Sequence, residues 1–593
     1  MNTDEKLLAY LTAKSAYQSK AISKEQGFTF ISKITGIPQI WTLNGKGEPV
    51  QFAELEDRVL SVFHSPNGKQ TAVGMDHHGN EKQQLYLIEE QGKEVFSLIN
   101  EPDYFHHIGG WSPDGEKIVF SSNRRHPGHF DLFTVDVVSK QVTKHFEYDG
   151  NLVPIGWLPN GESILIKIRE TNIDSSIYIY HIASGNKVKI GKDQVLGRYD
   201  GIKVTKNEEK AYLLTDVEEE TVYIGVVDLK QPENIEKVVH VEGWDVEEIS
   251  LSPNEEKLVY TLNEGGIFKL YSLDCTTGIK ENLEIASKGV IDSISWLDDE
   301  TFIFTMISPV SPGDIWKYSF ATNQFERLTY ISQSEVEKDW IEPDICTFKS
   351  FDELEVPYFF YEKEKTANRP VVIYVHGGPE GQTRAEYNPV IQFLADQGFA
   401  VAAPNVRGSS GYGRTYIKLD DVRKRMDSVA DLAWLVKDLI STHQVDPKKI
   451  GVMGRSYGGF MVLAALTHYP DLWAAGVDIV GISHFKTFLE NTGSWRRRLR
   501  ACEYGTLEDD TDFFEEIAPL NHSERIQAPL IVFHGRNDTR VPVSEAEQLV
   551  ADMQSRGQTV EFTVFEDEGH QTERIENHIT MNSEIIQFLK KYL

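Results

Sequence analysis

Cysteine and long apolar runs are both scarce in this sequence. The chain has 593 residues but only three cysteines, Cys275, Cys346 and Cys502, which are far apart and odd in number. They provide neither a disulfide framework nor the spacing of a metal site, so each is expected to be a small buried residue. This usage fits a reducing, cytoplasmic location. No stretch reaches the length of a membrane span, and residues 1–14 lack the apolar core of a secretory signal. We therefore expect no membrane partner.

Positive charge is also in deficit. Sixty Lys and Arg residues stand against 91 Asp and Glu residues, which gives a formal net charge of -31. That acidity argues against nucleic acid or an anionic membrane surface as a partner, and it favours solubility with at most a modest bias against acidic substrates. The sequence also lacks phosphate-binding glycine loops, zinc-ligand clusters and heptads. It therefore predicts no cofactor and no metal ion, and it leaves open whether the chain is a monomer or a homo-oligomer.

The first half of the chain is a repeat. A turn of the form Ser-Pro-Asn/Asp-Gly occurs at 65–68 and 112–115, with looser copies at 158–161, 205–208, 252–255 and 296–299, so its period is 44 to 47 residues. An aromatic residue inside an alternating run keeps the same phase, at Trp41, Tyr86, Phe133, Tyr178, Tyr223, Tyr271 and Trp316. Short strands repeated at this length are typical of a β-propeller with four strands per blade. A β-sandwich is less consistent with so regular a period.

The pattern changes after about Trp340. Buried strand-like runs at 370–376, 400–403, 449–453, 529–534 and 560–565 alternate with helical stretches at 390–397, 427–442 and 460–468. This alternation predicts a mostly parallel, doubly wound sheet with helices on both faces, as in an α/β-hydrolase. The expected domains are an N-terminal helical segment (1–21), a β-propeller of seven blades (22–335) and an α/β-hydrolase catalytic domain (336–593).

A nucleophile motif lies in the second half. Residues 454–458 read Gly-Arg-Ser-Tyr-Gly, directly after a predicted strand and before a predicted helix. This is the context of a nucleophile elbow, in which flanking glycines allow the strand and helix to approach each other. Ser456 is therefore the predicted nucleophile.

A nucleophilic serine needs a histidine base and an acid that orients it. In this fold they follow the serine in the order Asp, His, each in a loop after a later strand. Asp538 follows the strand that ends at His534, and His570 follows the strand that ends at Phe565. Asp512 and His578 are weaker candidates, because Asp512 follows no clear strand and His578 falls inside a terminal helix.

The oxyanion of an acyl-transfer reaction needs two preorganised donors. One is expected to be the backbone N–H of Tyr457, the residue after the nucleophile. The other is expected in 376–379, His-Gly-Gly-Pro, which follows the first long strand of the catalytic domain and where Gly377 allows a close approach to the substrate.

These motifs together resemble the prolyl oligopeptidase family of serine peptidases. The resemblance rests on His-Gly-Gly-Pro at 376–379, Asn-Val-Arg-Gly-Ser-Ser-Gly-Tyr-Gly at 405–413, Gly-Arg-Ser-Tyr-Gly-Gly at 454–459, and the settings of Asp538 and His570. The sequence is most similar to the acylaminoacyl-peptidase branch, which implies a backbone N–H as the second oxyanion donor. Other branches use a tyrosine hydroxyl near this position, where the present chain has His376. The resemblance also implies that the propeller covers the active site and admits only small substrates.

The dipeptidyl-peptidase branch holds a free amino terminus with paired glutamates of the propeller. The pairs Glu218-Glu219 and Glu247-Glu248 are candidates, but they fall where the repeat expects strand or hairpin residues, and we interpret them as solvated surface.

The predicted function is therefore a serine peptidase acting on short peptides, of the acylaminoacyl-peptidase or oligopeptidase type. A carboxylesterase or amidase with the same triad, a dipeptidyl peptidase and a non-catalytic propeller scaffold are the alternatives.

A segment that follows the next strand after the nucleophile helix, residues 480–504, is aromatic and basic. A side-chain pocket is predicted from Ile482, Phe485, Phe488 and Trp495, and a carbonyl or carboxylate contact from Arg496 or Arg497, with Arg498 adjacent. Neighbouring residues point in different directions, so at most one of the three arginines is expected to face the site. The opposing interpretation is that the aromatics belong to the core and the arginines pair with surface acids.

Overall fold

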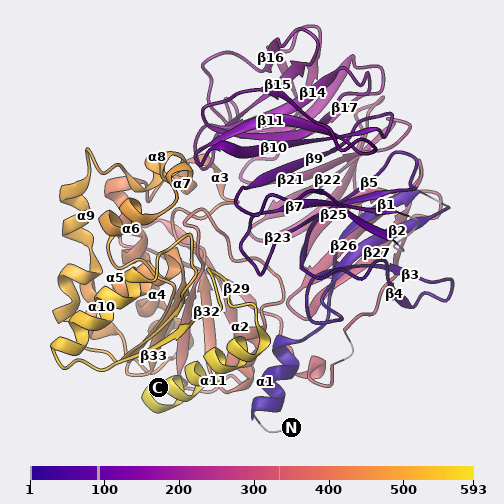
Figure 1. Cartoon of the computed structure of the whole chain (residues 1–593). Helices are drawn as coiled ribbons and strands as arrows, with labels where there is room; N and C mark the ends of the chain where they lie inside the picture. Colours follow the sequence, from indigo (N-terminus) through magenta and orange to yellow (C-terminus); the bar gives the residue numbers. More distant parts are fainter. Residues whose placement is uncertain (1–2, 24, 90–93, 333) are drawn as a thin grey trace.

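The computed structural model describes residues 3–23, 25–89, 94–332 and 334–593, and it contains two domains in contact (Figure 1). The N-terminal domain is built from seven four-stranded antiparallel sheets arranged as the blades of a propeller. The C-terminal domain is an eight-stranded sheet with helices on both faces. Both the propeller and the α/β-hydrolase fold expected from the sequence are confirmed. Within the described residues, no helix is both long and apolar enough to cross a membrane.

Each blade consists of four consecutive strands. Blades 1 to 3 contain β1 (Ala16–Ser23), β2 (Gly27–Ser32), β3 (Gln39–Leu43), β4 (Pro49–Gln51); β5 (Val59–His64), β6 (Thr71–Met75), β7 (Gln84–Glu89), β8 (Glu94–Ile99); and β9 (His106–Trp111), β10 (Lys117–His126), β11 (His129–Asp136), β12 (Val142–Phe146). Blades 4 and 5 contain β13 (Asn151–Trp157), β14 (Ser163–Arg169), β15 (Ser175–His181), β16 (Lys187–Ile190); and β17 (Tyr199–Val204), β18 (Lys210–Thr215), β19 (Tyr223–Asp228), β20 (Ile235–Val239). Blades 6 and 7 contain β21 (Asp245–Leu251), β22 (Lys257–Glu264), β23 (Ile267–Asp274), β24 (Lys280–Asn282); and β25 (Val290–Trp296), β26 (Thr301–Ser308), β27 (Ser311–Ser319), β28 (Gln324–Arg327).

The repeated turn joins the first two strands of blades 2 to 7. In blade 2 the Ser65 hydroxyl accepts a hydrogen bond from the Gln70 N–H (3.0 Å), and the Asn67 side chain accepts one from the Lys69 N–H (2.9 Å). The fourth residue has a positive φ, +68° at Gly68, which explains why glycine occupies it in the best copies. The periodic aromatic residue lies in the third strand of every blade. In every blade except the fifth, it belongs to an apolar cluster formed with a neighbouring blade.

The start of the propeller differs from the expected boundary. The helix α1 covers only Thr3–Leu11, and residues 16–23 form β1, which pairs with β2 as the first strand of blade 1. The first copy of the repeat is degenerate, because no clear copy of the turn follows its first strand. The sequence therefore showed no sign of that strand. Helix α1 itself belongs to the catalytic domain, because Leu7 and Tyr10 are buried against α2 and α11.

The ring is closed without a shared strand. Blade 1 and blade 7 each use only their own four strands, and they meet through β1, β25 and β26. The Ser19 hydroxyl donates to the Ser293 carbonyl (3.0 Å), and the Ala21 N–H donates to the Ser295 hydroxyl (3.0 Å). A small apolar cluster from both blades, which includes Phe30 and Ile303, packs beside these bonds.

The catalytic-domain sheet has the order β29-β30-β32-β31-β33-β34-β35-β36. Its strands are β29 (Asp344–Lys349), β30 (Glu355–Tyr361), β31 (Val371–Val375), β32 (Ala400–Pro404), β33 (Ile450–Arg455), β34 (Ala475–Ile479), β35 (Leu530–Gly535) and β36 (Val560–Phe565), and all pairs from β32 to β36 are parallel. The helices are α2 (Pro389–Asp396), α3 (Gly413–Ile417), α4 (Arg425–His443), α5 (Tyr457–His468), α6 (Phe485–Asn491), α7 (Ser494–Leu499), α8 (Ala501–Tyr504), α9 (Thr511–Ile517), α10 (Ser544–Ser555) and α11 (Ile575–Tyr592), with 3-10 turns at Glu337–Asp339, Val422–Lys424, Pro470–Leu472 and Pro519–Arg525.

Two apolar cores hold the helices to this sheet. Helices α4, α5 and α10 pack in one core, and α1, α2 and α11 pack in the other. The strands are buried on both faces, which accounts for the nearly continuous apolar runs in their sequences. Because the strands are parallel, the loops after β31, β33, β35 and β36 meet at one edge of the sheet, where ligands of such folds bind.

Candidate active site

Ser456 sits on a sharp turn between β33 and α5. Its backbone has φ +60° and ψ −119°, a conformation that non-glycine residues adopt rarely and that marks stored strain. The turn is possible only with glycine on both sides. A Cβ at Gly454 would lie 2.3 Å from the Gly458 carbonyl oxygen, and one at Gly458 would lie 2.4 Å from the Val375 carbonyl oxygen. This is the local geometry of a nucleophile elbow.

Asp538 and His570 lie in the loops after β35 and β36. The Nδ1 atom of His570 is 2.7 Å from Asp538 Oδ2. The other carboxylate oxygen accepts hydrogen bonds from the backbone N–H groups of Arg540 (2.8 Å) and Val541 (2.9 Å). These bonds orient the carboxylate toward Nδ1 of His570. Nε2 of the imidazole is then the nitrogen that can accept a proton. His570 and Ser456 both line a single cavity of about 390 Å³.

Burial keeps His570 in its neutral form. It is the largest cause that lowers the pKa of His570, with the nearby charges of Arg540 and Arg455 adding to it and Asp538 opposing it. Burial alone would raise the pKa of Asp538, but its hydrogen bond and charge interaction with His570 outweigh that effect and lower it. A neutral imidazole beside an ionised carboxylate is the protonation state that a general base requires.

The competing candidates lie elsewhere. Asp512, in α9, has a side chain 71% exposed and pairs with Arg423. His578, in α11, is largely surrounded by protein, and burial lowers its pKa to about 4. Neither residue lines the cavity that contains Ser456.

The two predicted oxyanion donors flank Ser456. Tyr457 is the first residue of α5, so its N–H has no partner within the helix. Gly377 follows β31, and a Cβ at this position would lie 3.5 Å from Ser456 Cβ, which shows how closely this backbone approaches the nucleophile. His376 is turned to other partners, since its Nε2 is 2.9 Å from the Ser409 hydroxyl.

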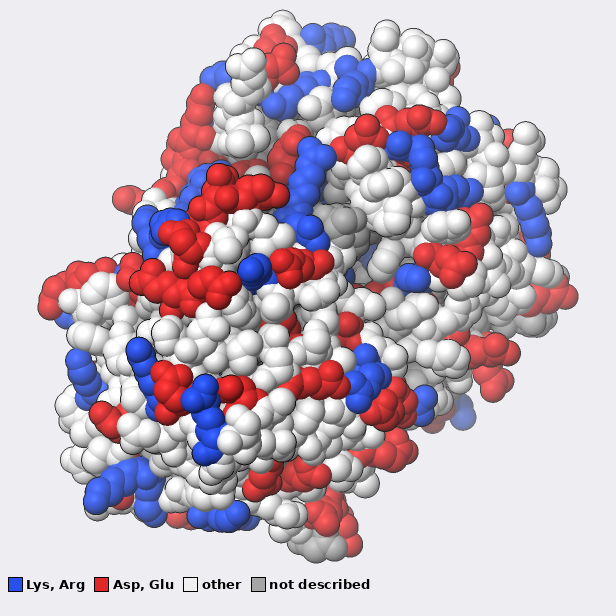
Figure 2. Space-filling model, turned by 60° about the vertical axis from the view of Figure 1, so that its left-hand side comes forward, with Lys and Arg blue, Asp and Glu red and all other residues white. Residues whose placement is uncertain are grey.

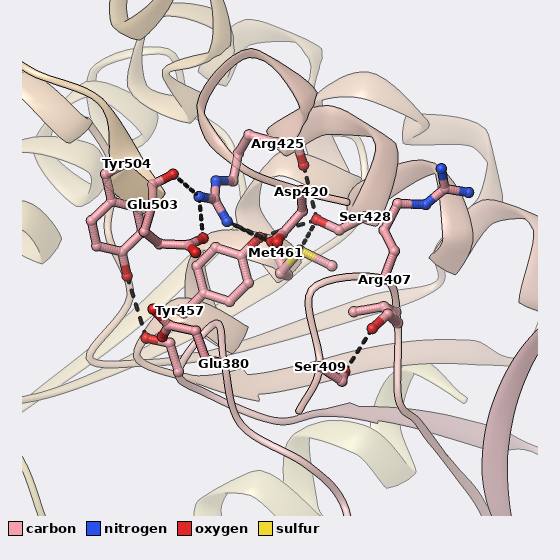
Figure 3. A network of polar contacts seen from close by, with 12 residues as sticks. Glu380, Arg407, Ser409, Asp420, Arg425, Ser428, Tyr457, Met461, Glu503 and Tyr504 are labelled. Atoms are coloured by element: carbon pink, nitrogen blue, oxygen red, sulfur yellow. Dashed lines mark hydrogen bonds and ion pairs between the residues drawn. The ribbon is translucent and has the colours of Figure 1, made fainter. Parts of the chain in front are cut away.

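A buried polar network, which the sequence did not reveal, holds the side chain of Tyr457 (Figure 3). The Tyr457 hydroxyl is 3.0 Å from each of Asp420 Oδ2, Arg425 Nη1 and Ser428 Oγ. Arg425 is 1% exposed, and its guanidinium also bonds Asp420 (2.5 Å) and Glu503. The acids of this cluster could suggest a metal site, because ligand atoms of Asp420, Asp421 and Glu503 lie within 4.8 Å of one another. The Arg425 cation already bonds two of them.

The same network reaches the second donor. The ring of Tyr504 is tilted against that of Tyr457, with centroids 6.4 Å apart, and its hydroxyl donates to the Gly378 carbonyl (3.4 Å). Arg500 donates to that carbonyl as well (3.2 Å) and to the Tyr504 hydroxyl (2.7 Å). The backbone next to Gly377 and the backbone of Tyr457 are therefore braced by one connected set of side chains.

The structure brings only part of the predicted pocket to the cavity. Ile482, Phe488 and Arg496 line it. Phe485 does not; it packs in the core, with its ring 4.7 Å from that of Phe460. Arg497 also points elsewhere and donates to the Glu490 carbonyl (3.0 Å). The side chain of Trp495 lies outside the part of the chain that the structure describes.

Several lining residues were missed, two of them within the segment 480–504 itself and the others in separate segments. The apolar wall also includes Val541, and the polar lining includes Tyr504, Arg384, Arg455, Arg500 and Arg540. Arg540 follows Asp538 by two positions, and Arg455 precedes Ser456, so both stand beside residues that the sequence had already singled out. The direction of their side chains could not be predicted, because a loop sequence does not specify which way a side chain points.

The interpretation of Glu247 and Glu248 as solvated surface is wrong. The Glu247 side chain is 13% exposed and binds Asn263 (3.0 Å) and Arg384 (3.4 Å), so it lies at the domain interface. Glu248 accepts a hydrogen bond from the Ile294 N–H (2.9 Å), and burial, followed by the charge of Asp292, raises its pKa to about 7. Strand β21 therefore directs Glu247 at the catalytic domain and Glu248 at blade 7. Glu218 does match the interpretation, with a side chain 64% exposed.

The fold and this geometry together define an α/β-hydrolase domain covered by a seven-bladed propeller. A family model for the prolyl oligopeptidase family matches residues 385–593, so the C-terminal part of the chain is a domain of that family, as the motifs predicted. Dipeptidyl aminopeptidase BIII of Pseudoxanthomonas mexicana is 29% identical over 333 residues, which cover 53% of this chain and 48% of that protein. An acylamino-acid-releasing enzyme of Arabidopsis thaliana is 25% identical over 241 residues, 39% of this chain and 31% of that protein.

The curated relatives are thus matched over about half of their length or less. Among solved structures, a puromycin hydrolase aligns over 100% of this chain and 96% of its own, with a TM-score of 0.88 and 15% sequence identity. That similarity extends the shared fold to the propeller.

Proposed function

We propose that this protein is a serine peptidase that hydrolyses short peptides, with Ser456 as nucleophile, His570 as general base and Asp538 as the acid that orients it. The observation that carries the proposal is the placement of Ser456 on a strained elbow in the same cavity as a His570–Asp538 pair joined at 2.7 Å. The family domain and the peptidase relatives support peptides as the substrate class.

The proposed reaction has two stages. His570 Nε2 takes the hydroxyl proton as Ser456 Oγ attacks the scissile carbonyl, and the N–H groups of Tyr457 and Gly377 stabilise the oxyanion. The imidazolium then donates that proton to the leaving amine, and an acyl-enzyme remains. Water, deprotonated by the same imidazole, releases the acid. Ile482, Phe488 and Val541 offer an apolar surface for the side chain at the cleaved bond.

The three unpaired cysteines are in keeping with a cytoplasmic location.

The first test is the removal of the nucleophile. Ser456→Ala should reduce peptide hydrolysis by roughly 10⁴-fold or more and abolish labelling by a fluorophosphonate probe, while the melting temperature stays close to that of the wild type. Asp538→Asn should also cost roughly 10⁴-fold, because it disfavours the required tautomer of His570. Asp512→Asn is the matched control, since this acid is exposed and remote.

Labelling that persists in Ser456→Ala, or a loss with Asp512→Asn equal to that with Asp538→Asn, would refute the assignment. Rates on an ester and a peptide with the same acyl group separate a peptidase from a carboxylesterase, because both share this triad.

A further inference from the structure

The cavity around Ser456 is strongly basic. Five arginines line it, Arg384, Arg455, Arg496, Arg500 and Arg540, whereas Glu386 is the one carboxylate among the described lining residues. This is the reverse of the whole chain, which carries a net charge of -31 and displays acidic side chains widely on the face shown in Figure 2. A basic cavity in so acidic a protein requires a local explanation.

Three of these arginines gather beside the catalytic histidine. Arg496 comes from α7, Arg500 from the turn between α7 and α8, and Arg540 from the loop that carries Asp538. They are close enough for their charges to interact. Burial, followed by the charges of Arg540 and Arg500, lowers the pKa of Arg496 to about 10 against the opposing charge of Glu81. We call Arg496, Arg500 and Arg540 the arginine cluster.

The ion pairs of the arginine cluster centre on Glu81. Glu81, from the propeller, binds both Arg496 (3.3 Å) and Arg540. Arg500 donates to neutral groups, the Gly378 carbonyl and the Tyr504 hydroxyl. One carboxylate is therefore shared by two guanidinium groups, and Arg500, which bonds neutral groups, also lies near the charges of Glu380 and Glu503.

The other charged residues of the lining leave its net charge positive. Arg384 pairs with Glu247 (3.4 Å), and Arg455 donates to the His570 carbonyl (2.7 Å). Glu386 lies near Arg384, and burial raises its pKa, which weakens it as a counter-charge. A surplus of partly buried cations is unfavourable unless an anion joins them, and guanidinium groups bind carboxylates in a directed, bidentate manner.

We propose that the arginine cluster binds a carboxylate of the peptide substrate, so that the enzyme prefers substrates with an anionic group within reach of the scissile bond. This inference rests on the proposed peptidase function. The carboxylate has two sources, the side chain of Asp or Glu and the free C-terminus of a short peptide. Both present the same chemistry to the cluster, and the apolar Ile482, Phe488 and Val541 pack alongside the stem of either.

The test compares matched peptides on the wild-type enzyme. One series exchanges Gln for Glu at each position on either side of the cleaved bond, and a second exchanges a C-terminal amide for the free acid. We expect kcat/KM to rise roughly 10-fold or more on adding the carboxylate in one of the two series, because a hydrogen bond to a charged group is worth more than one to a neutral group. A rise in the first series identifies an acidic side chain, and a rise in the second identifies the C-terminus.

Variants locate the effect. Arg496→Gln, Arg500→Gln and Arg540→Gln should each reduce the acid-to-neutral ratio several-fold, and Arg500→Lys should retain part of it. Two neighbours are matched controls. Arg497→Gln removes an arginine that faces away from the cavity, and Arg498→Gln removes a contact with the propeller, the bond from Arg498 to the Asp149 carbonyl (2.9 Å). Both should keep the wild-type ratio.

A wild-type ratio near or below 1 in both series would overturn the inference without any variant. So would a ratio that the three cluster variants leave unchanged, or that Arg497→Gln reduces equally. Failure of the proposed function is distinct, because it would show as no cleavage of any peptide and no fluorophosphonate labelling of Ser456.

Discussion

In the proposed mechanism, the environment of His570 determines the acid limit of activity. His570 must be neutral to accept the serine proton, so activity is lost as the pH falls through its pKa. Burial lowers that pKa from the usual value of about 6.5, with Arg540 and Arg455 acting in the same direction. The acid limb of kcat/KM should therefore have its midpoint below 6.5, measured with a neutral, uncharged peptide.

Arg540 provides the variant for this profile. Replacing it with Gln removes a cation that disfavours the imidazolium, so the midpoint should move to higher pH. Arg536→Gln is the matched control, because Arg536 lies in the same loop but pairs at the surface with Glu566 (3.0 Å) and Glu547 (2.6 Å). A midpoint at or above 6.5 in the wild type, or an equal shift in both variants, would contradict this account.

Single residues also show what the sequence could and could not predict. Ser456, Asp538 and His570 could be proposed from the sequence because each stands at a fixed point, after a strand whose position the apolar runs reveal. Of the arginine cluster, only Arg496 was among the predicted site residues. Arg500 follows Arg496 in the same predicted segment, whereas Arg540 comes from the loop after β35, and their convergence depends on how α7 and that loop fold over the sheet.

The start of helix α4 brings a charge into the core. Arg425 is the first residue of that helix, and its guanidinium joins Asp420, Glu503 and the hydroxyl of Tyr457. Removing one member of such a buried ion pair leaves uncompensated charge, which typically costs about 3–5 kcal/mol. Arg425→Met should therefore destabilise the catalytic domain by this amount in denaturant unfolding.

The same variant should slow acylation. Because the network braces Tyr457 and, through Tyr504, the backbone of Gly378, its loss should lower kcat more than it raises KM, and Arg425→Lys should restore part of kcat. Arg423→Met is the control, since Arg423 lies two positions earlier, is 54% exposed and binds the exposed Asp512. An unchanged kcat in a folded Arg425→Met enzyme would show that the network serves stability alone.

Secondary structure was predictable where the pattern was periodic. The turn and the aromatic marker specify the first-to-second strand connection and the third strand of a blade, so the blade count followed from them. The first strand, residues 16–23, was missed because blade 1 lacks a clear turn. The predicted helix at 427–442 begins two residues earlier, at Arg425, where a buried cation interrupts the expected apolar spacing.

The propeller contacts two residues that line the cavity, because Glu81 binds Arg496 and Arg540, and several further ion pairs join the two domains. Arg414, in α3, binds Asp174 (2.5 Å) in blade 4 and Asp216 (2.9 Å) in blade 5. Arg58 of blade 2 pairs with Glu573, which follows His570 by three positions. Sequence patterns within each domain carried no sign of these contacts, because they form between surfaces and not within a repeat.

This contact of the propeller with the cavity should make the enzyme selective for size. Peptides of a few residues should be cleaved readily, whereas casein should resist digestion by the intact protein. Arg414→Ala removes two contacts across the domain interface and should raise casein cleavage, measured by the release of peptides, without improving kcat/KM on a short peptide. Arg556→Ala, which removes an exposed pair with Asp552, is the control. Rapid casein digestion by the wild type would contradict the size filter.

The seam between blades 1 and 7 has a mechanical consequence. The chain enters the propeller at β1 and leaves it at β28, so both covalent links to the catalytic domain are attached on either side of the seam. Any force that separates the domains is therefore transmitted to the one joint in the described ring that the chain itself does not cross. That joint is held by non-covalent contacts alone, among them the hydroxyl contacts of Ser19 and Ser295 and a small apolar cluster. The propeller is therefore a ring that is covalently open at one joint, and both of its ends are attached to the same domain.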